Sequence, residues 1–161
     1  MEMTFATVSP YFSGCSALLG ITIPKGVTEI SERAFEGCSA MTYVALSEGL
    51  AQIGEYAFVG CSALTELNLP ESLTEIGAGA FGGCKFTGDL IIPDSVTHIG
   101  DSAFAACAEL TELHIPATMT EMDEYAQAMA FFYCSKLTIY GEAGSFIETV
   151  CNEQGIPFVA E

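Results

Sequence analysis

Cysteine and histidine are the residue types that could perform nucleophilic chemistry here, and the chain has seven cysteines and two histidines. A thiol nucleophile needs a base within hydrogen-bond distance. Five cysteines recur at a constant spacing of 23 residues, namely Cys15, Cys38, Cys61, Cys84 and Cys107. We expect all five to start a repeating unit and to point inward, whereas His98 falls on a second wall and His114 on an outward strand position. The spacing therefore argues against a cysteine enzyme, and we expect no catalytic residues.

Acidic side chains are the other candidates, as ligands for a cation. The chain has 21 Asp and Glu against four Lys and Arg, for a formal net charge of −17. Asp89, Asp94 and Asp101 share one unit, but their spacing matches no EF-hand loop. Zinc would need clustered ligands such as Cys-x-x-Cys, which the sequence lacks. We favour a solvated acidic surface, and expect no metal and no cofactor.

The same charge limits the possible partners. It would repel phosphate backbones and anionic lipid head groups, so nucleic acid and membrane surfaces are poor partners and a basic protein is easier to bind. No apolar run approaches the roughly 18 residues that a transmembrane helix needs. The first residues also lack the positive region of a signal peptide.

The 23-residue period extends to nearly every position and predicts a solenoid, in which each unit contacts only its neighbours. In one unit, the pattern Leu-x-x-Leu-x-Leu-Pro at 64–70 predicts a short strand, and the apolar pair at 73–76 predicts a second extended segment on the opposite wall. We expect strands of a first parallel sheet near 19–23, 42–46, 65–69, 90–92 and 112–115. Strands of a thinner second sheet are expected near 28–30, 51–53, 74–76, 97–99 and 120–122.

Two side chains of each unit should build the interior. An Ala-Phe pair recurs at 34–35, 57–58, 80–81, 103–104 and 130–131. One phenylalanine per coil should form an aromatic spine. Neighbouring repeat cysteines would lie one strand spacing apart, about 4.8 Å, with parallel Cβ directions that suit a disulfide poorly. We therefore expect these cysteines to be buried and reduced.

The full pattern, Leu-x-x-Leu-x-Leu-Pro-x-x-Leu-Thr-x-Ile-Gly-x-x-Ala-Phe-x-Gly-Cys, resembles the BspA-like leucine-rich repeat of bacterial surface and secreted proteins and covers essentially residues 5–140. The resemblance implies a leucine-rich-repeat solenoid, a right-handed superhelix that is mainly β with short helical or 3-10 turns. The chain lacks the asparagine that follows the strand in ordinary leucine-rich repeats. In its fourth unit Thr87 replaces the first leucine, and we expect Phe86 to fill that space.

The ends of the array depart from the repeat. Four extra residues separate Cys107 from Cys134, and residues 123–130 are rich in helix formers, which predicts a helix there. Residues 145–148 form a capping box, and Gly155 should end the helix that follows, with a last strand near 156–159. We expect one domain over 1–161, with a partial repeat or N-terminal edge at 1–14, repeats at 15–140 and a C-terminal cap at 141–161.

Side chains that change from unit to unit are the best indication of a binding site. The outward positions of the first strands should form an acidic and polar strip, and we predict that a partner binds Tyr43, Glu66, Asn68, Asp89, Glu112 and His114. The family resemblance implies a non-enzymatic interaction module of a cell-surface or secreted bacterial protein, binding a protein or a glycan, with a basic partner favoured by the charge. The alternative is a structural spacer that presents another domain and binds nothing itself.

Overall fold

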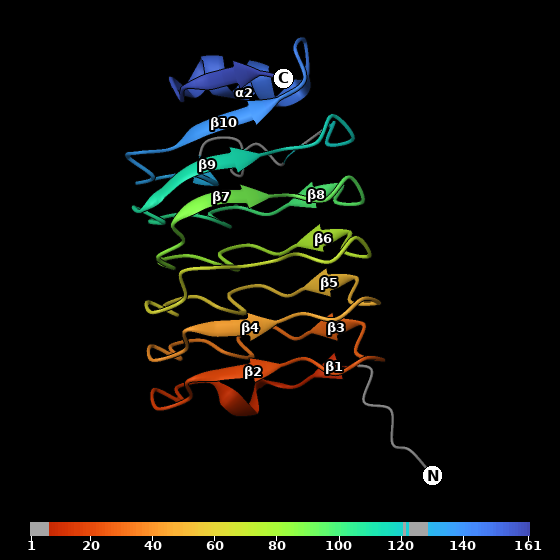
Figure 1. Cartoon of the computed structure of the whole chain (residues 1–161), viewed down its shortest axis with the longest axis vertical. Coiled ribbons are helices and arrows are strands. Elements are labelled where there is room, and N and C mark those ends of the chain that lie inside the picture. The colour runs from red at the N-terminus through yellow and green to blue at the C-terminus, as the bar shows by residue number, and fades with distance from the viewer. Residues whose placement is uncertain (1–6, 121, 123–128) are drawn as a thin grey trace.

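The computed structural model describes residues 7–120, 122 and 129–161, and it is a β-solenoid of about six turns with parallel sheets. In Figure 1 the coils stack one above another, with the strands in two columns. The first column contains β2 (Gly20–Thr22), β4 (Tyr43–Ala45), β7 (Gly88–Ile91), β9 (Leu110–His114), β10 (Thr138–Gly141) and β11 (Phe158–Ala160). The second contains β1 (Thr7–Val8), β3 (Glu29–Ile30), β5 (Gln52–Ile53), β6 (Glu75–Ile76) and β8 (His98–Ile99). A 3-10 turn η1 (Pro10–Phe12) and a helix α2 (Phe146–Gln154) lie near the two ends.

The second column confirms the thinner sheet predicted from the second apolar pair. Its five strands are parallel, in the order β1-β3-β5-β6-β8. The register places Ile30, Ile53, Ile76 and Ile99 in one buried row, with one isoleucine from each coil. The strand expected at 120–122 includes residue 121, which lies outside the described residues, and neither Thr120 nor Met122 is in a strand.

The first column is divided, which corrects the prediction of one continuous sheet. β2 pairs only with β4, while β7, β9, β10 and β11 form a separate four-stranded sheet. The segment 65–69, expected to be a strand between them, is not one. In the part of the chain that the structure describes, the next coil reaches this segment through one backbone hydrogen bond, from the Thr87 amide to the Thr65 carbonyl, and reaches the adjacent Leu64 carbonyl from the Lys85 amide.

Phe86 provides the physical reason for this break on the side that faces coil four. Its side chain is only 2% exposed and meets Phe81 edge to face, with ring centroids 5.7 Å apart, so it fills the space of the missing leucine as predicted. Gly88 follows in the left-handed conformation, with φ of 80°. The register shifts between Gly88 and Asp89. Because coil four enters the core one residue early, the Lys85 and Thr87 amides bond to Leu64 and Thr65 out of the 23-residue register, and the period is restored from Asp89 onward. The structure offers no comparable reason on the β4 side of that segment.

The predicted aromatic spine is present. Six phenylalanine rings stack along the solenoid, with neighbouring centroids 5.1–6.4 Å apart. They are Phe12, Phe35, Phe58, Phe81, Phe104 and Phe131. The near-parallel offset arrangement follows from identical side chains repeating at the coil spacing, and it is a favourable geometry for aromatic pairs.

Each inner phenylalanine is also hydrogen-bonded to the following coil through its backbone. The Phe58 amide donates to the Ala80 carbonyl over 2.7 Å, and the Phe58 carbonyl accepts from the thiol of Cys84, with Sγ 3.4 Å away. The same pair of bonds recurs at Phe35, Phe81 and Phe104. We call this two-bond arrangement the Phe–Cys clamp. It explains why cysteine recurs: the thiol is a small apolar group that also carries a weak donor.

The cysteines are free thiols, as predicted. Cys38, Cys61, Cys84, Cys107 and Cys151 are buried. Cys15, expected to be buried, is only half-buried, because it lies in the first coil and no earlier coil covers it among the described residues. Cys134, in the last coil, is likewise half-buried.

The C-terminal segment covers the last coil as predicted. Ser145 caps α2 by accepting a hydrogen bond from the Glu148 amide, and Gly155 ends the helix with φ of 69°. Ile147, Val150 and Cys151 are the buried face of α2. β11 then pairs with β10 and continues the four-stranded sheet. The helix expected at 123–130 falls mainly on residues 123–128, which lie outside the described residues.

The spine predicts a difference between two alanine substitutions. Phe81 is fully buried and contacts three other rings, whereas Phe12 is half-buried and contacts only Phe35 among the described residues. F81A should therefore lower the free energy of unfolding by about 3–5 kcal/mol, and F12A by clearly less. Urea unfolding followed by circular dichroism measures both. Equal losses would contradict a spine that is continuous through the array.

Candidate functional site

The strip of six predicted residues lies on the outer face of the first column. Tyr43 is on β4, Glu66 and Asn68 are on segment 65–69, Asp89 is on β7, and Glu112 and His114 are on β9. Strand alternation explains their direction, because Val44, Leu67, Leu90 and Leu113, which lie between or beside them, are buried. The buried aliphatic side chains thus fix the direction of the variable side chains, which point outward.

The four-stranded sheet brings the C-terminal half of the strip together. Asp89 and Glu112 are register partners on adjacent parallel strands, so two carboxylates lie side by side. In the next row, Ile91, His114 and Tyr140 are register partners. The His114 ring stacks on Tyr140 with centroids 4.8 Å apart, and its Nδ1 lies 2.8 Å from Oε1 of Glu161. This half is therefore an ordered row of charged and aromatic groups.

Tyr43 is separated from that row by the break in the sheet. Its register partner on β2 is Gly20, and the Tyr43 ring lies where a side chain at residue 20 would project. A methyl group at residue 20 would collide with the ring, so a larger residue there would force the Tyr43 side chain to move. Tyr43 is 54% exposed, so one face of its ring covers Gly20 while much of the side chain is open to a partner.

Two hollows lie along the break. One has a volume of about 170 Å³ and contacts Thr65, Glu66, Asn68 and Asp89 above a floor of apolar side chains. The other has a volume of about 230 Å³ and is lined by Asn68, Asp89 and Ile91, among others. Asn68 and Asp89 line both hollows, so the middle of the strip is an indented surface with polar rims.

The carboxylates of the strip have no cation beside them. Over the described residues, the basic side chains in ion pairs are Arg33, which pairs with Glu32 and Glu36, and Lys136, which pairs with Glu109, together with His114. Glu66, Asp89 and Glu112 take part in none of these pairs. Within the same ranges, no group of three or more His, Cys, Asp or Glu is placed to hold a metal ion.

The repeat geometry agrees with a direct comparison of sequences. The model of the BspA type leucine rich repeat region matches six copies over residues 8–138. The chain belongs to the BspA-type leucine-rich repeat family. A comparison with curated proteins gave no match.

Solved structures of leucine-rich repeat proteins are similar to this one. A leucine rich cell surface protein from Faecalibacterium prausnitzii is 31% identical with a TM-score of 0.71, over 81% of this chain and 34% of its own. A leucine-rich repeat protein from Bacteroides ovatus is 29% identical with a TM-score of 0.67, over 86% and 43%. The leucine rich repeat protein of T. pallidum is 30% identical with a TM-score of 0.69, over 76% and 58%. This chain therefore spans between about a third and three fifths of the length of these relatives.

The BspA-type coil also has features that sequence reasoning missed. Tyr140 and Glu161 hold His114, but both follow the last repeat, so the period gave no signal for them. On the second wall, a hollow of about 390 Å³ is lined by several acids, including Glu29, Glu75 and Asp101, together with His98. The sequence could have indicated this hollow, because the residues at 29, 52, 75 and 98 occupy one position of the repeat. None of the described helices is long and apolar enough to cross a membrane.

The thiols of the Phe–Cys clamp are poor nucleophiles. Burial, followed by the neighbouring cysteine, raises the pKa of Cys61 and of Cys107 to about 12. Burial likewise raises the pKa of Cys84 well above its usual value. Since the thiolate is the reactive form, these groups stay protonated and unreactive near neutral pH. Their protons are also the ones that the phenylalanine carbonyls accept.

These pKa shifts predict that the BspA-type array loses stability at high pH. A thiol titrates near pH 8.5 when unfolded, so its protonated form stabilises the fold below that pH and progressively less as pH rises toward 12. Between these values each such cysteine should cost about 1.4 kcal/mol per pH unit. The free energy of unfolding, measured in urea from pH 7 to about 11, should fall less steeply in C61A/C107A than in the unsubstituted chain.

All other ionisable groups are common to both chains, so the difference in slope isolates the thiols. Parallel slopes would contradict the raised pKa values. A titration in denaturant without reductant should find all seven thiols; a smaller number would indicate a disulfide.

Proposed function

We propose that the chain is a non-enzymatic interaction module of a bacterial cell-surface or secreted protein, and that it binds a basic protein partner through the strip. One observation carries this proposal: three carboxylates, Glu66, Asp89 and Glu112, lie on the outer face of the first column, exposed or partly exposed, without an ion-pair partner among the described residues. Such a row attracts a complementary positive surface and accelerates its association.

The setting of the strip supports specific recognition. The residues beneath it are buried and apolar in every coil, whereas the exposed pair of residues differs from coil to coil, although Glu66 and Glu112 share one repeat position. The hollows around Asn68 and Asp89 would admit side chains of a partner, and Tyr43 is the kind of exposed aromatic that anchors interfaces. His114, held by Tyr140 and Glu161, adds an ordered polar group at the other end.

A location outside the bacterial cell is supported by similarity to a cell-surface protein of known structure. The F. prausnitzii protein, a leucine rich cell surface protein, is 31% identical over most of this chain. We extend that location to the present protein. A non-catalytic role is supported by the inward, protonated thiols and by the engagement of His114 with Tyr140 and Glu161.

The proposal predicts the effect of charge reversal on the strip. In E66K/D89K, association with a captured protein partner should slow by about tenfold at low salt, because the attractive field is lost. The melting temperature should hardly change, because both side chains are exposed. Surface plasmon resonance at two salt concentrations measures the rate constant.

The matched control is E55K/E75K, which makes the same change of charge on the second wall. It should leave the on-rate nearly unchanged. If instead E55K/E75K slows association and E66K/D89K does not, the binding surface belongs on the opposite wall. If the chain with the repeats captures no more protein from host or bacterial extracts than the same protein without them, the module is a spacer.

A further inference from the structure

The last coil differs from all others at the turn that precedes its cysteine. In the earlier coils the two residues before the cysteine are Ser-Gly, Glu-Gly, Val-Gly, Gly-Gly and Ala-Ala, and in the last coil they are Phe132 and Tyr133. Neither ring is needed for the core, because Phe132 is 43% and Tyr133 is 71% exposed. Their ring centroids are 4.1 Å apart. The turn therefore presents two adjacent aromatic side chains to solvent.

Tyr133 occupies this turn at an energetic cost. The position has a left-handed backbone in every coil, and glycine fills it four times, at Gly14, Gly37, Gly60 and Gly83. Tyr133 has φ of 63°, in the region that side chains disfavour. A strained, exposed aromatic residue at a position that glycine fills in four coils and Ala106 in a fifth is better explained by a ligand than by folding.

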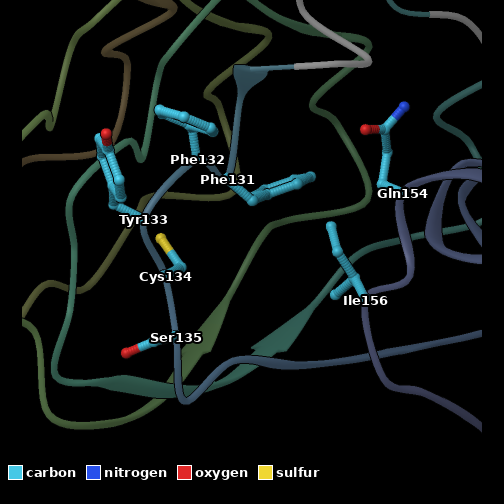
Figure 2. Close-up of a pocket in the computed structure, with 7 residues that line it drawn as sticks. All are labelled: Phe131, Phe132, Tyr133, Cys134, Ser135, Gln154 and Ile156. Atoms are coloured by element: carbon cyan, nitrogen blue, oxygen red, sulfur yellow. The ribbon is translucent and has the colours of Figure 1, made fainter.

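The two rings stand beside a hollow. It has a volume of about 320 Å³, at the lower end of the usual range for small-ligand sites, and it lies between this turn and the segment that ends α2. Figure 2 shows Phe131 and Ile156 on facing sides of the hollow, Gln154 on the α2 side, and Phe132 and Tyr133 on the other side. The lining thus combines apolar walls with the amide of Gln154 and the hydroxyl of Ser135.

The chemistry of the lining indicates the class of ligand. None of the seven described residues that line it is charged, in a chain whose net charge is −17. Among the described residues, the side chains of Ser135 and Gln154 have no hydrogen-bond partner, and neither does the hydroxyl of Tyr133. A sugar ring meets all of these conditions, because its C–H face packs on aromatic rings and its hydroxyls both donate to and accept from amides and hydroxyls.

We propose that the hollow between Phe132, Tyr133 and Gln154 binds a sugar ring of a neutral glycan. This site lies in the last coil, apart from the acidic strip, and does not depend on the strip's having a protein partner. In it, Tyr133 provides the stacking surface, and Gln154 and Ser135 bind ring hydroxyls.

The test uses cellohexaose, maltohexaose and chitohexaose as probes with the full chain. At millimolar concentration, saturation-transfer NMR should show contact with at least one of them, and calorimetric titration should then give its dissociation constant. Y133G should weaken that binding by about tenfold or more, since it removes the stacking ring. Y133G restores the residue used in other coils, so its melting temperature should stay the same or rise. Q154A should weaken binding to a smaller extent.

The matched control is Y11A, which removes an 87% exposed tyrosine near the opposite end of the solenoid and should leave sugar binding intact. The E66K/D89K variant should also bind the sugar normally, so failure of this proposal and failure of the strip are distinguishable. The proposal is overturned if none of the three probes receives saturation, or if binding survives Y133G. It is also overturned if the probes fail while Y133G abolishes capture of a protein, because the hollow would then be a protein contact.

Discussion

The Phe–Cys clamp is the interaction on which the rest of this solenoid depends. Each inner phenylalanine is joined to the next coil by its amide, by its carbonyl and by its stacked ring. Ring burial contributes on the order of 2 kcal/mol per coil, and the backbone bonds define how far and at what angle one coil lies above another. Since the thiol must remain protonated to donate, the same contact that orders the coils also removes the cysteines from chemistry.

Because buried contacts hold the coils together, the exposed positions can vary from coil to coil. Both proposed sites consist of such exposed positions. On the strand face, variation produces unpaired carboxylates above constant leucines. At the turn of the last coil, Tyr133 replaces the usual glycine although the backbone there is left-handed, which strains a residue with a side chain. The two sites differ in character, because the strip is acidic and shallow whereas the hollow is neutral and partly apolar. One array can therefore carry sites for chemically different ligands.

The break in the first sheet shows how a single core residue shapes the surface. Phe86 enters the core where other coils place a leucine one residue later, and segment 65–69 loses strand pairing with β7. The hollows beside Asn68 and Asp89 lie at this break.

The period of 23 residues determined the solenoid, the two walls and the aromatic spine, because each follows from a local pattern repeated at constant spacing. The C-terminal helix followed from its own local signals, the capping box at 145–148 and Gly155. The period also placed the six strip residues outward. Only the tertiary structure decided that segment 65–69 is unpaired, that His114 meets Tyr140 and Glu161, and that Phe132 and Tyr133 stand beside Gln154. These features depend on contacts between one coil and the next, or between the last coil and a cap outside the repeat. The repeat period predicts only the features that all coils share, whereas these contacts involve residues at which the coils differ.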